Sequence, residues 1–315
     1  MAGHLSLWPL LLAESIYLAL ILWIGDHAHL GMSLLFIGAA GLLLWERPLA
    51  PRPLGGWGRW AGSVLLAGVV AACLWLWGQG LNTTEGHPLR LLPLLALVGW
   101  VLWREGWRGL GGRWREALIL FALGGPHLLA DWAGLAGPLA RWGARDAGYL
   151  LWYLGVEARV AGPEVWVPGG AILVTPGCAG TDLLTYLLGI AVVALLLFPL
   201  ERPRWGLVLG GAALCAYAVN VTRLALLALL NAGSGRAAFD YWHTSEGAQV
   251  FGVIAIGLFA LFYWRLTRME LAPSRQQFQT WNTEEHGGHR EDRWWRLLLA
   301  RIRIALEERT NLRRS

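Results

Sequence analysis

The sequence predicts an all-α, polytopic membrane protein with about eight transmembrane helices and a short extracytoplasmic β-hairpin. Hydrophobic residues make up 56% of the 315 residues and charged residues only 15%, and the mean hydropathy is +0.46. Soluble domains are about 45–50% apolar and about 25% charged. The composition therefore excludes an ordinary soluble enzyme, and it carries too much apolar surface for a disordered chain.

Long apolar stretches give the positions of the expected spans. A helix needs about 20 mostly apolar residues to cross a hydrocarbon core about 30 Å thick. The first stretch lacks a preceding basic segment and a small-residue cleavage site, which favours a retained span over a removed signal peptide. The expected spans are Leu7–Ile24, Leu30–Trp45, Trp60–Trp77, Pro88–Trp103, Ala117–Leu135, Thr181–Phe198, Trp205–Leu230 and Gly247–Trp264.

Arginine positions predict the orientation. All 26 basic residues are Arg, the formal net charge is +5, and the arginines cluster in short segments. Arg-rich loops follow the second, fourth and sixth expected spans, and cytoplasmic loops are enriched in basic residues. We therefore expect both termini to be cytoplasmic and the alternate loops to face outward. This clustering indicates membrane topology rather than nucleic-acid binding, and many of the 21 Trp residues bracket the spans as an aromatic belt would.

The expected organisation is a membrane domain over residues 1–264 and a basic cytoplasmic tail over residues 265–315. Within the tail, residues 292–309 place apolar side chains on one helical face with arginines around it. This pattern predicts an amphipathic helix on the inner leaflet, attracted by anionic lipid.

The longest outer segment leads to a cysteine. Polar and apolar residues alternate around residues 156–174, and Pro168, Gly169 and Gly170 separate residues 164–167 from residues 171–174, which predicts a hairpin. Cys178 follows, between Gly177 and Gly180, where the sixth expected span begins. Unpaired N–H groups and the helix dipole favour a thiolate at a helix N-terminus. A small apolar residue that fills space is the alternative.

The seventh expected span contains Asn220 and Arg223. An arginine inside a span costs at least about 2.5 kcal/mol on insertion scales and therefore indicates function. The alternative is a structural Arg, for which Asp182 is the expected partner. Just before the eighth span, His243 is expected at the same outer level as Cys178. A thiol, an imidazole and a fixed cation are the groups that acyl transfer needs.

These motifs resemble the exosortase/archaeosortase family of membrane cysteine transpeptidases. The resemblance rests on Gly177-Cys178-Ala179-Gly180, on Asn220-Val221-Thr222-Arg223, and on His243 with Gly247, in the family's order. At residue level it covers about residues 156–264. Ala179 stands where Ser is usual, which puts the subfamily in doubt more than the chemistry.

The resemblance implies proteolytic sorting. Such enzymes cut secreted proteins that carry a C-terminal signal made of a Pro-Glu-Pro-like motif, a transmembrane helix and a basic cluster. By resemblance, Cys178 is the nucleophile, Arg223 the oxyanion stabiliser and His243 the general acid and base, with Asp182 and Asn220 in support. It implies no cofactor and no metal, an amine or lipid acceptor or water, and a bacterial inner membrane with the site outside.

Two other classes stay open at this stage. The outer His and Asp residues suit zinc, and a metal-dependent hydrolase would follow. A transporter would use Arg223 and Asp182 to line a polar pathway, although no repeat is visible and Gly210-Gly211 favours close helix packing. The residues of the metal alternative are Asp26, His27, His29, His127 and Asp131.

Overall fold

The architecture comes from a computed structural model of the whole chain, which describes residues 7–46, 56–79, 87–233 and 236–271. Residues 1–266 form one compact unit and residues 267–315 a second. The interfacial helix expected over residues 292–309 lies outside the described residues.

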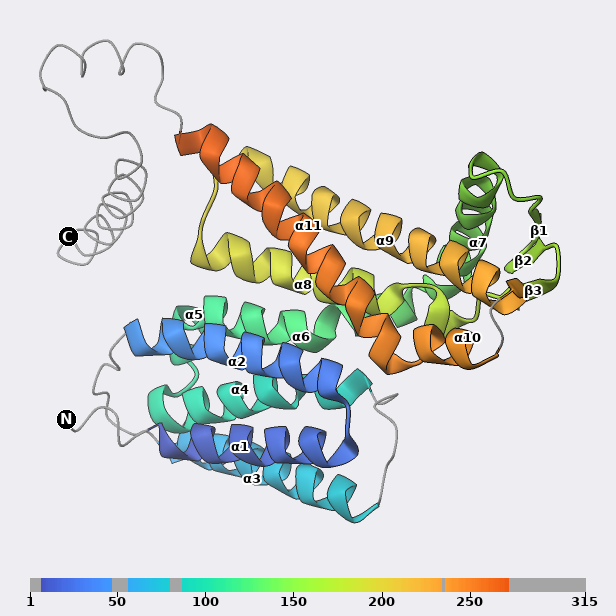
Figure 1. Cartoon of the computed structure of the whole chain (residues 1–315). Coiled ribbons are helices and arrows are strands. Elements are labelled where there is room, and N and C mark those ends of the chain that lie inside the picture. The colour runs from blue at the N-terminus through green and yellow to red at the C-terminus, as the bar shows by residue number, and fades with distance from the viewer. Residues whose placement is uncertain (1–6, 47–55, 80–86, 234–235, 272–315) are drawn as a thin grey trace, which may run out of the picture. The chain divides into compact units, whose positions relative to one another are not determined.

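Helices at each predicted span position form the body of the first unit (Figure 1). Prolines begin several of them, because a proline in the first turn costs no hydrogen bond. The N-terminal half contains α1 (Trp8–Ile24), α2 (His27–Glu46), α3 (Gly56–Gly78), the short 3-10 helix η2 (His87–Leu91), α4 (Leu92–Glu105), α5 (Gly109–Gly112) and α6 (Trp114–Trp132). The C-terminal half contains α7 (Ala136–Tyr153), the 3-10 helix η3 (Pro176–Cys178), α8 (Thr181–Leu197), the 3-10 helix η4 (Arg202–Arg204), α9 (Trp205–Gly233), α10 (Arg236–His243) and α11 (Ser245–Leu271).

The predicted count of about eight spans is not confirmed. Among the described residues, five helices are long and apolar enough to cross a membrane. The helix α4 has 14 residues and α1 has 17, so at 1.5 Å per residue both fall short of about 30 Å. The helix α6 qualifies only together with α7, at a bend of 87°, which would make a sixth span. The five are His27–Trp45, Gly56–Gly78, Pro176–Leu197, Arg202–Gly233 and Gly247–Arg268.

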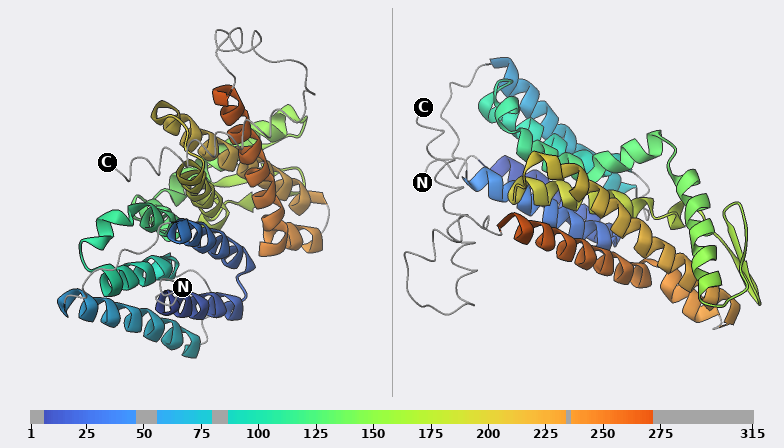
Figure 2. Two further views of the ribbon diagram at one scale, coloured as in Figure 1. Left: turned by 90° about the vertical axis from the view of Figure 1, so that its left-hand side faces the viewer. Right: turned by 90° about the horizontal axis from the view of Figure 1, so that it is seen from above.

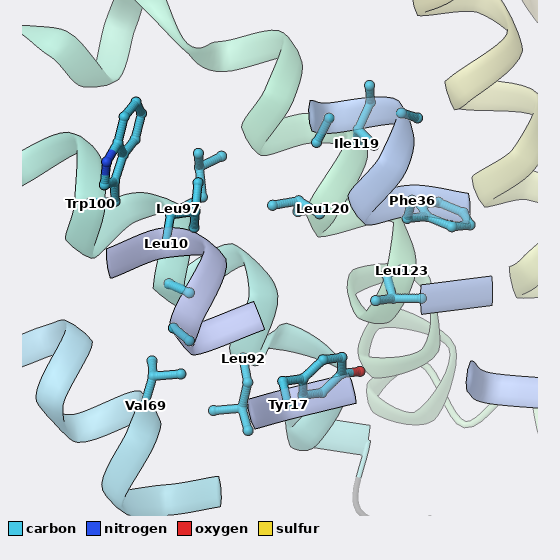
Figure 3. Close-up of a cluster of buried hydrophobic side chains, with 14 of the residues drawn as sticks. Leu10, Tyr17, Phe36, Val69, Leu92, Leu97, Trp100, Ile119, Leu120 and Leu123 are labelled. Atoms are coloured by element: carbon cyan, nitrogen blue, oxygen red, sulfur yellow. The ribbon is translucent and has the colours of Figure 1, made fainter. Parts of the chain in front are cut away.

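Three clusters of buried apolar side chains hold this unit together. The first cluster contains residues of the four helices α1, α2, α3 and α4, of α6 and of the C-terminal half of α8. Tyr17, Phe36 and Trp100 are its largest side chains (Figure 3). The second joins α7, a small sheet and the C-terminal half of α9, and it includes Cys178. The third joins α8, α9 and α11. The cysteine thus lies within a packed layer of the C-terminal half.

The segment between α6 and α8 differs from its predicted form. The expected hairpin is confirmed as β2 (Glu164–Val167) and β3 (Gly170–Leu173), antiparallel, with β1 (Arg159–Ala161) added at the edge. The same outer segment also contains a helix that the hairpin prediction did not include, because residues 136–153 form α7. The helix and the sheet lie at one end of the bundle, beside the C-terminal end of α9 (Figure 2).

Small residues allow several helices to approach closely, as is common in membranes. A Cβ added at Gly211 of α9 would lie 2.3 Å from the Phe262 ring of α11. A Cβ at Gly62 of α3 would lie 2.3 Å from the backbone nitrogen of Trp103 in α4. The close approach at Gly211 agrees with the packing role expected for the Gly210-Gly211 pair, whereas a Cβ at Gly210 would meet nothing within 4 Å.

A Gly62→Ala variant is expected to lose about 1–3 kcal/mol of stability, because the added methyl group meets backbone atoms that cannot rotate away. Thermal unfolding of the purified protein in detergent should show a lower Tm. The matched control is Gly68→Ala on the same helix, where an added Cβ meets nothing within 4 Å. Equal unfolding temperatures for the two variants would contradict the packing of α3 on α4.

Candidate active site

Cys178 is presented by a tight turn in front of α8. It is the last residue of η3, whose backbone N–H bonds to the carbonyl of Thr175 at 2.9 Å. The helix α8 begins at Thr181, so the thiol lies at its N-terminal end, as the sequence predicted. The residue is 7% exposed. The turn therefore holds a buried sulfur near the positive end of the helix dipole.

Asn220 of α9 is hydrogen-bonded to this turn. Its Nδ2 donates to the carbonyl oxygen of Cys178 at 3.2 Å, and the side chain is 3% exposed. Gly180 has a φ of +83°, and a Cβ there would lie 2.6 Å from the Asn220 amide. Glycine is thus required twice at position 180, by the left-handed backbone and by the close approach of Asn220. The Asn220 amide therefore packs directly against the turn that contains Cys178 and Gly180.

His243 completes a thiol–imidazole pair. It is the last residue of α10, and its Nε2 lies 3.2 Å from the Sγ of Cys178. The Phe239 ring, one turn earlier on α10, stacks on the imidazole with ring centroids 5.2 Å apart and an angle of 12° between the ring planes. This stacking sets the orientation of the ring toward the sulfur. Two residues that are 65 positions apart in sequence are thereby brought within hydrogen-bond distance.

Arg223 reaches the same place from α9. Its Nη2 donates to the backbone carbonyl of His243 at 3.4 Å, and its Nε is buried with no hydrogen-bond partner among the described residues. Arg223 is thus linked to His243 by a hydrogen bond to the backbone and not to the imidazole ring. The ion pair with Asp182 that the sequence suggested as a structural alternative is absent from the described part of the chain, where Asp182 has other partners.

A cavity of about 130 Å³ borders the thiol and the imidazole. Three residues of β3 form one wall, where the Asn231 amide donates to the carbonyl of Ala171 at 2.8 Å. Leucine side chains of α9 form another wall. The cavity is lined by Ala171, Ile172, Leu173, Cys178, Leu224, Leu227, Asn231, Phe239 and His243. A substrate carbonyl in this space would meet both the sulfur and the imidazole.

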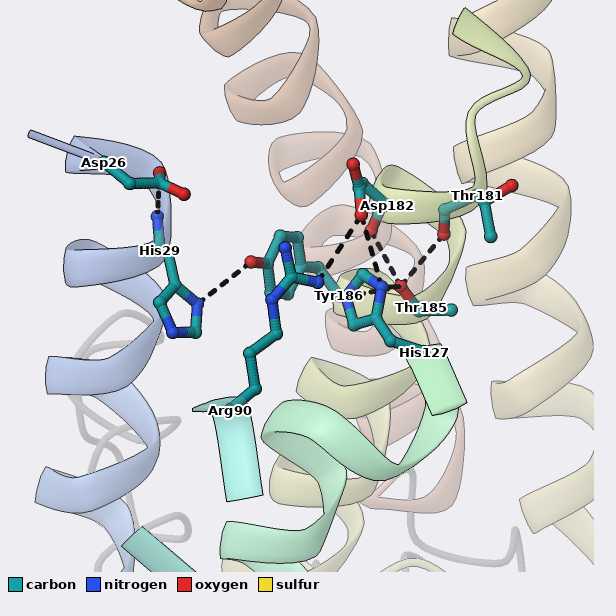
Figure 4. A network of polar contacts seen from close by, with 8 residues as sticks. All are labelled: Asp26, His29, Arg90, His127, Thr181, Asp182, Thr185 and Tyr186. Atoms are coloured by element: carbon teal, nitrogen blue, oxygen red, sulfur yellow. Dashed lines mark hydrogen bonds and ion pairs between the residues drawn. The ribbon is translucent and has the colours of Figure 1, made fainter. Parts of the chain in front are cut away.

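Asp182 belongs to a separate network that ties α8 to the N-terminal half (Figure 4). Its Oδ1 lies 3.5 Å from Nη1 of Arg90 and 3.2 Å from Nδ1 of His127. The Arg90 guanidinium also lies over the Tyr186 ring, 5.1 Å from its centroid. Arg90 and His127 are 5% and 1% exposed, so the carboxylate of Asp182, in the first turn of α8, lies against two buried polar groups. Among the described residues, Asp182 therefore contacts Arg90 and His127 and not the Arg223 guanidinium or the His243 imidazole.

The same network contains three of the five residues of the metal alternative, Asp26, His29 and His127 (Figure 4). His29 bonds through Nδ1 to the Tyr186 hydroxyl at 3.1 Å and through Nε2 to the Tyr17 hydroxyl at 2.7 Å. The Asp26 carboxylate accepts the backbone N–H of His29 at 2.9 Å. Within the described ranges, no group of three His, Cys, Asp or Glu side chains is placed to hold a metal ion. Sequence reasoning missed Arg90 and Tyr186, because their partners are far away along the chain.

An Asn220→Ala variant is expected to process substrate about five- to tenfold more slowly, because the hydrogen bond that holds the Cys178 carbonyl is worth about 1 kcal/mol. The measurement is the initial rate of substrate cleavage in membranes that contain equal amounts of each variant. Thr222→Ala is the matched control, since this exposed hydroxyl of α9 bonds only to Ala218 of its own helix. A rate equal to that of the control would contradict a supporting role for Asn220.

A thiol and an imidazole at one end of a helical membrane bundle, with an arginine bonded to the histidine backbone, define the class of membrane proteins with a cysteine-based site. The chain matches the family model described as "Transmembrane exosortase (Exosortase_EpsH)" over residues 23–260. It therefore belongs to the transmembrane exosortase family. The match extends well beyond the residues 156–264 on which the sequence resemblance rested.

Family membership implies a multi-pass membrane protein and a membrane cysteine transpeptidase that acts in protein sorting. No curated protein matches the chain significantly, and neither does any solved structure. The roles of individual residues therefore rest on the geometry of the site.

Proposed function

We propose that the protein is a membrane cysteine protease and transpeptidase that cleaves the C-terminal sorting signal of secreted proteins through a thioester intermediate. The observation that carries the proposal is the distance of 3.2 Å between the Cys178 sulfur and the His243 Nε2. A nucleophile and a base within hydrogen-bond reach are the minimum for covalent acyl transfer.

The proposed first half-reaction uses both partners of this pair. His243 takes the proton of the Cys178 thiol, and the sulfur attacks the scissile carbonyl carbon to give a tetrahedral oxyanion. The carbon–nitrogen bond then breaks, His243 returns the proton to the leaving amine, and a thioester remains on Cys178. The second half-reaction reverses these roles: an amine acceptor loses a proton to His243 and attacks the thioester, which releases the thiol. Water in place of the amine gives hydrolysis.

Arg223 is proposed to stabilise the oxyanion. Its Nε is buried without a partner among the described residues, while Nη2 is held by the His243 carbonyl. A cationic donor that is already oriented before the reaction lowers the barrier without reorganisation. Asn220 and Asp182 act as positioning residues, the first through the Cys178 carbonyl and the second through α8.

We propose that the site faces the extracytoplasmic side of a bacterial inner membrane and that both termini are cytoplasmic. Arginines gather at the turns on the other end of the bundle, between α4 and α6 and between α8 and α9, and basic loops remain on the cytoplasmic side. These residues are Arg104, Arg108, Arg113, Arg115, Arg202 and Arg204.

The substrate is proposed to be a secreted protein held in the membrane by its own C-terminal helix, next to a Pro-Glu-Pro-like motif and a basic cluster. Apolar side chains on α11 such as Val253 and Leu261 are 70% and 50% exposed, as lipid-facing residues are. A substrate helix that docks from the bilayer would set the depth of the cleavage motif and convert an encounter in solution into an oriented one. The acceptor is an amine, including the amine of a lipid, or water.

The test is processing of a C-terminally tagged secreted substrate in membranes that contain the enzyme. Iodoacetamide should stop cleavage, and the chelator 1,10-phenanthroline should leave it unchanged. The reverse pattern would replace the cysteine mechanism by a metal-dependent one. The same assay should show little cleavage of a soluble peptide that lacks the transmembrane segment, and equal cleavage would contradict lateral docking.

A further inference from the structure

The helix α7 runs across the direction of its neighbour. Its axis is bent by 87° from that of α6, which lies along the helix bundle (Figure 1). If α6 follows the membrane normal, α7 lies parallel to the membrane plane. Its position at the end of the bundle, beside the sheet, places it at the boundary between lipid and water.

The two faces of α7 are unlike those of a helix in a soluble protein. The buried face is made of alanine and glycine apart from Leu151, and a Cβ at Gly148 would lie 2.3 Å from a methyl group of Val160 in β1. The outer face carries large aromatic residues, with Trp142 52%, Trp152 63% and Tyr153 78% exposed. Tryptophan and tyrosine are enriched where an apolar ring meets a polar headgroup layer. This face therefore has the chemistry of a helix embedded in the membrane interface.

A groove of about 780 Å³ runs between this outer face and β1. Arg141, Trp142, Arg145, Tyr149 and Trp152 are among the residues that line it, and no acidic side chain does so. Positions 141, 145 and 149 are one turn apart on α7, so the two guanidinium groups and the phenol lie along the same stripe. The groove thus combines two cations with aromatic walls.

The charges of the groove are only partly compensated within the fold. Nε of Arg145 bonds to Oδ1 of Asp146 at 3.0 Å, and Oδ2 of Asp146 accepts the Tyr217 hydroxyl at 2.6 Å. Both oxygens of this carboxylate are therefore occupied, and the terminal nitrogens of Arg145 stay available. Arg141 makes no ion pair with any residue that the structure describes.

We propose that this groove binds the headgroup of an anionic phospholipid in the leaflet at the Cys178 end of the bundle. The phosphodiester would lie between Arg141 and Arg145, since guanidinium groups bind phosphate through paired hydrogen bonds. The aromatic face would lie at the level of the glycerol and the upper acyl chains. Bound lipid would then anchor α7, and with it the sheet and the cysteine turn packed on the other face of α7, at a fixed depth.

The experiment measures lipid retention by native mass spectrometry of the full-length protein, released from mixed micelles of phosphatidylglycerol and phosphatidylcholine. We expect the wild type to retain phosphatidylglycerol selectively. An R141Q/R145Q variant should retain it with about tenfold lower affinity, because each arginine near an anionic headgroup contributes to binding. Raising the salt concentration should weaken retention by the wild type.

The matched control is Arg159→Gln, which removes an exposed arginine of β1 that does not line the groove. It should behave like the wild type. Equal retention by R141Q/R145Q and wild type, or an equal loss in R159Q, would overturn the proposal. Displacement of the bound lipid by micromolar glycerol 3-phosphate would also overturn it, because the groove would then be a site for soluble phosphates. None of these outcomes depends on the proposed catalytic activity.

Discussion

A Cys178→Ala variant is expected to lose substrate cleavage by at least about a thousandfold, because no other group in the site replaces the nucleophile. The measurement is the ratio of full-length to cleaved substrate in membranes at equal enzyme abundance. The methyl group of alanine fits where the sulfur packs, so the fold should be kept.

The matched control for this prediction is the double variant Cys73→Ala/Cys215→Ala. These are the two other cysteines of the chain; both are free, and they lie within α3 and α9, away from His243. The double variant should cleave at close to the wild-type rate. Cleavage by Cys178→Ala at the wild-type rate would contradict the cysteine mechanism. The network of Arg90, His127 and Asp182 would then be the next reactive centre to test.

A His243→Ala variant is expected to cleave about 10²- to 10⁴-fold more slowly, because proton transfer by a positioned side chain contributes that much to a rate. The variant should also alkylate more slowly at Cys178 in a Cys73→Ala/Cys215→Ala background, since the imidazole that accepts the thiol proton is gone. Initial rates with the membrane-bound substrate and with iodoacetamide measure the two effects.

The control for this variant is His27→Ala. His27 is an exposed histidine at the start of α2, at the same end of the bundle and outside the cavity. It should change neither rate. A wild-type cleavage rate in His243→Ala would show that the imidazole takes no part in the reaction, despite its 3.2 Å contact with Cys178.

Much of the helical layout and of the thiol–imidazole pair was predictable from the sequence. Apolar runs mark lipid-crossing helices because the bilayer leaves few alternatives. The hairpin was visible because residues 164–167 alternate and a glycine pair follows, and the structure shifts its second strand by one residue only. Cys178 and His243 were both expected at the outer ends of spans, the sixth and the eighth, and the structure places them in contact.

The helix α7 could not be read from periodicity. Its buried face consists of alanine and glycine with the single Leu151, and its exposed face carries tryptophan and tyrosine beside arginine, so large apolar side chains do not mark the buried face. The partners of Asp182 could not be predicted from the sequence either. Arg90 lies 92 positions away in sequence, and only the packing of η2 and α6 against α8 brings the two charges together.

The number of spans depends on the lengths of the individual helices, which hydropathy alone does not define. Residues 88–103 read as one apolar stretch, but the structure divides them between η2 and the 14-residue helix α4. Glycine at positions 58, 62 and 99 lets α3 and α4 pack closely.

The central claim is that Cys178 carries the acyl group of the substrate, and the mass of the enzyme during turnover tests it most directly. Acid quenching followed by denaturing mass spectrometry should show a covalent adduct of the substrate's N-terminal fragment. The adduct should map to the peptide that contains Cys178 and be released by neutral hydroxylamine, as a thioester is. Turnover without any adduct on Cys178, or with an adduct on another residue, would contradict the account.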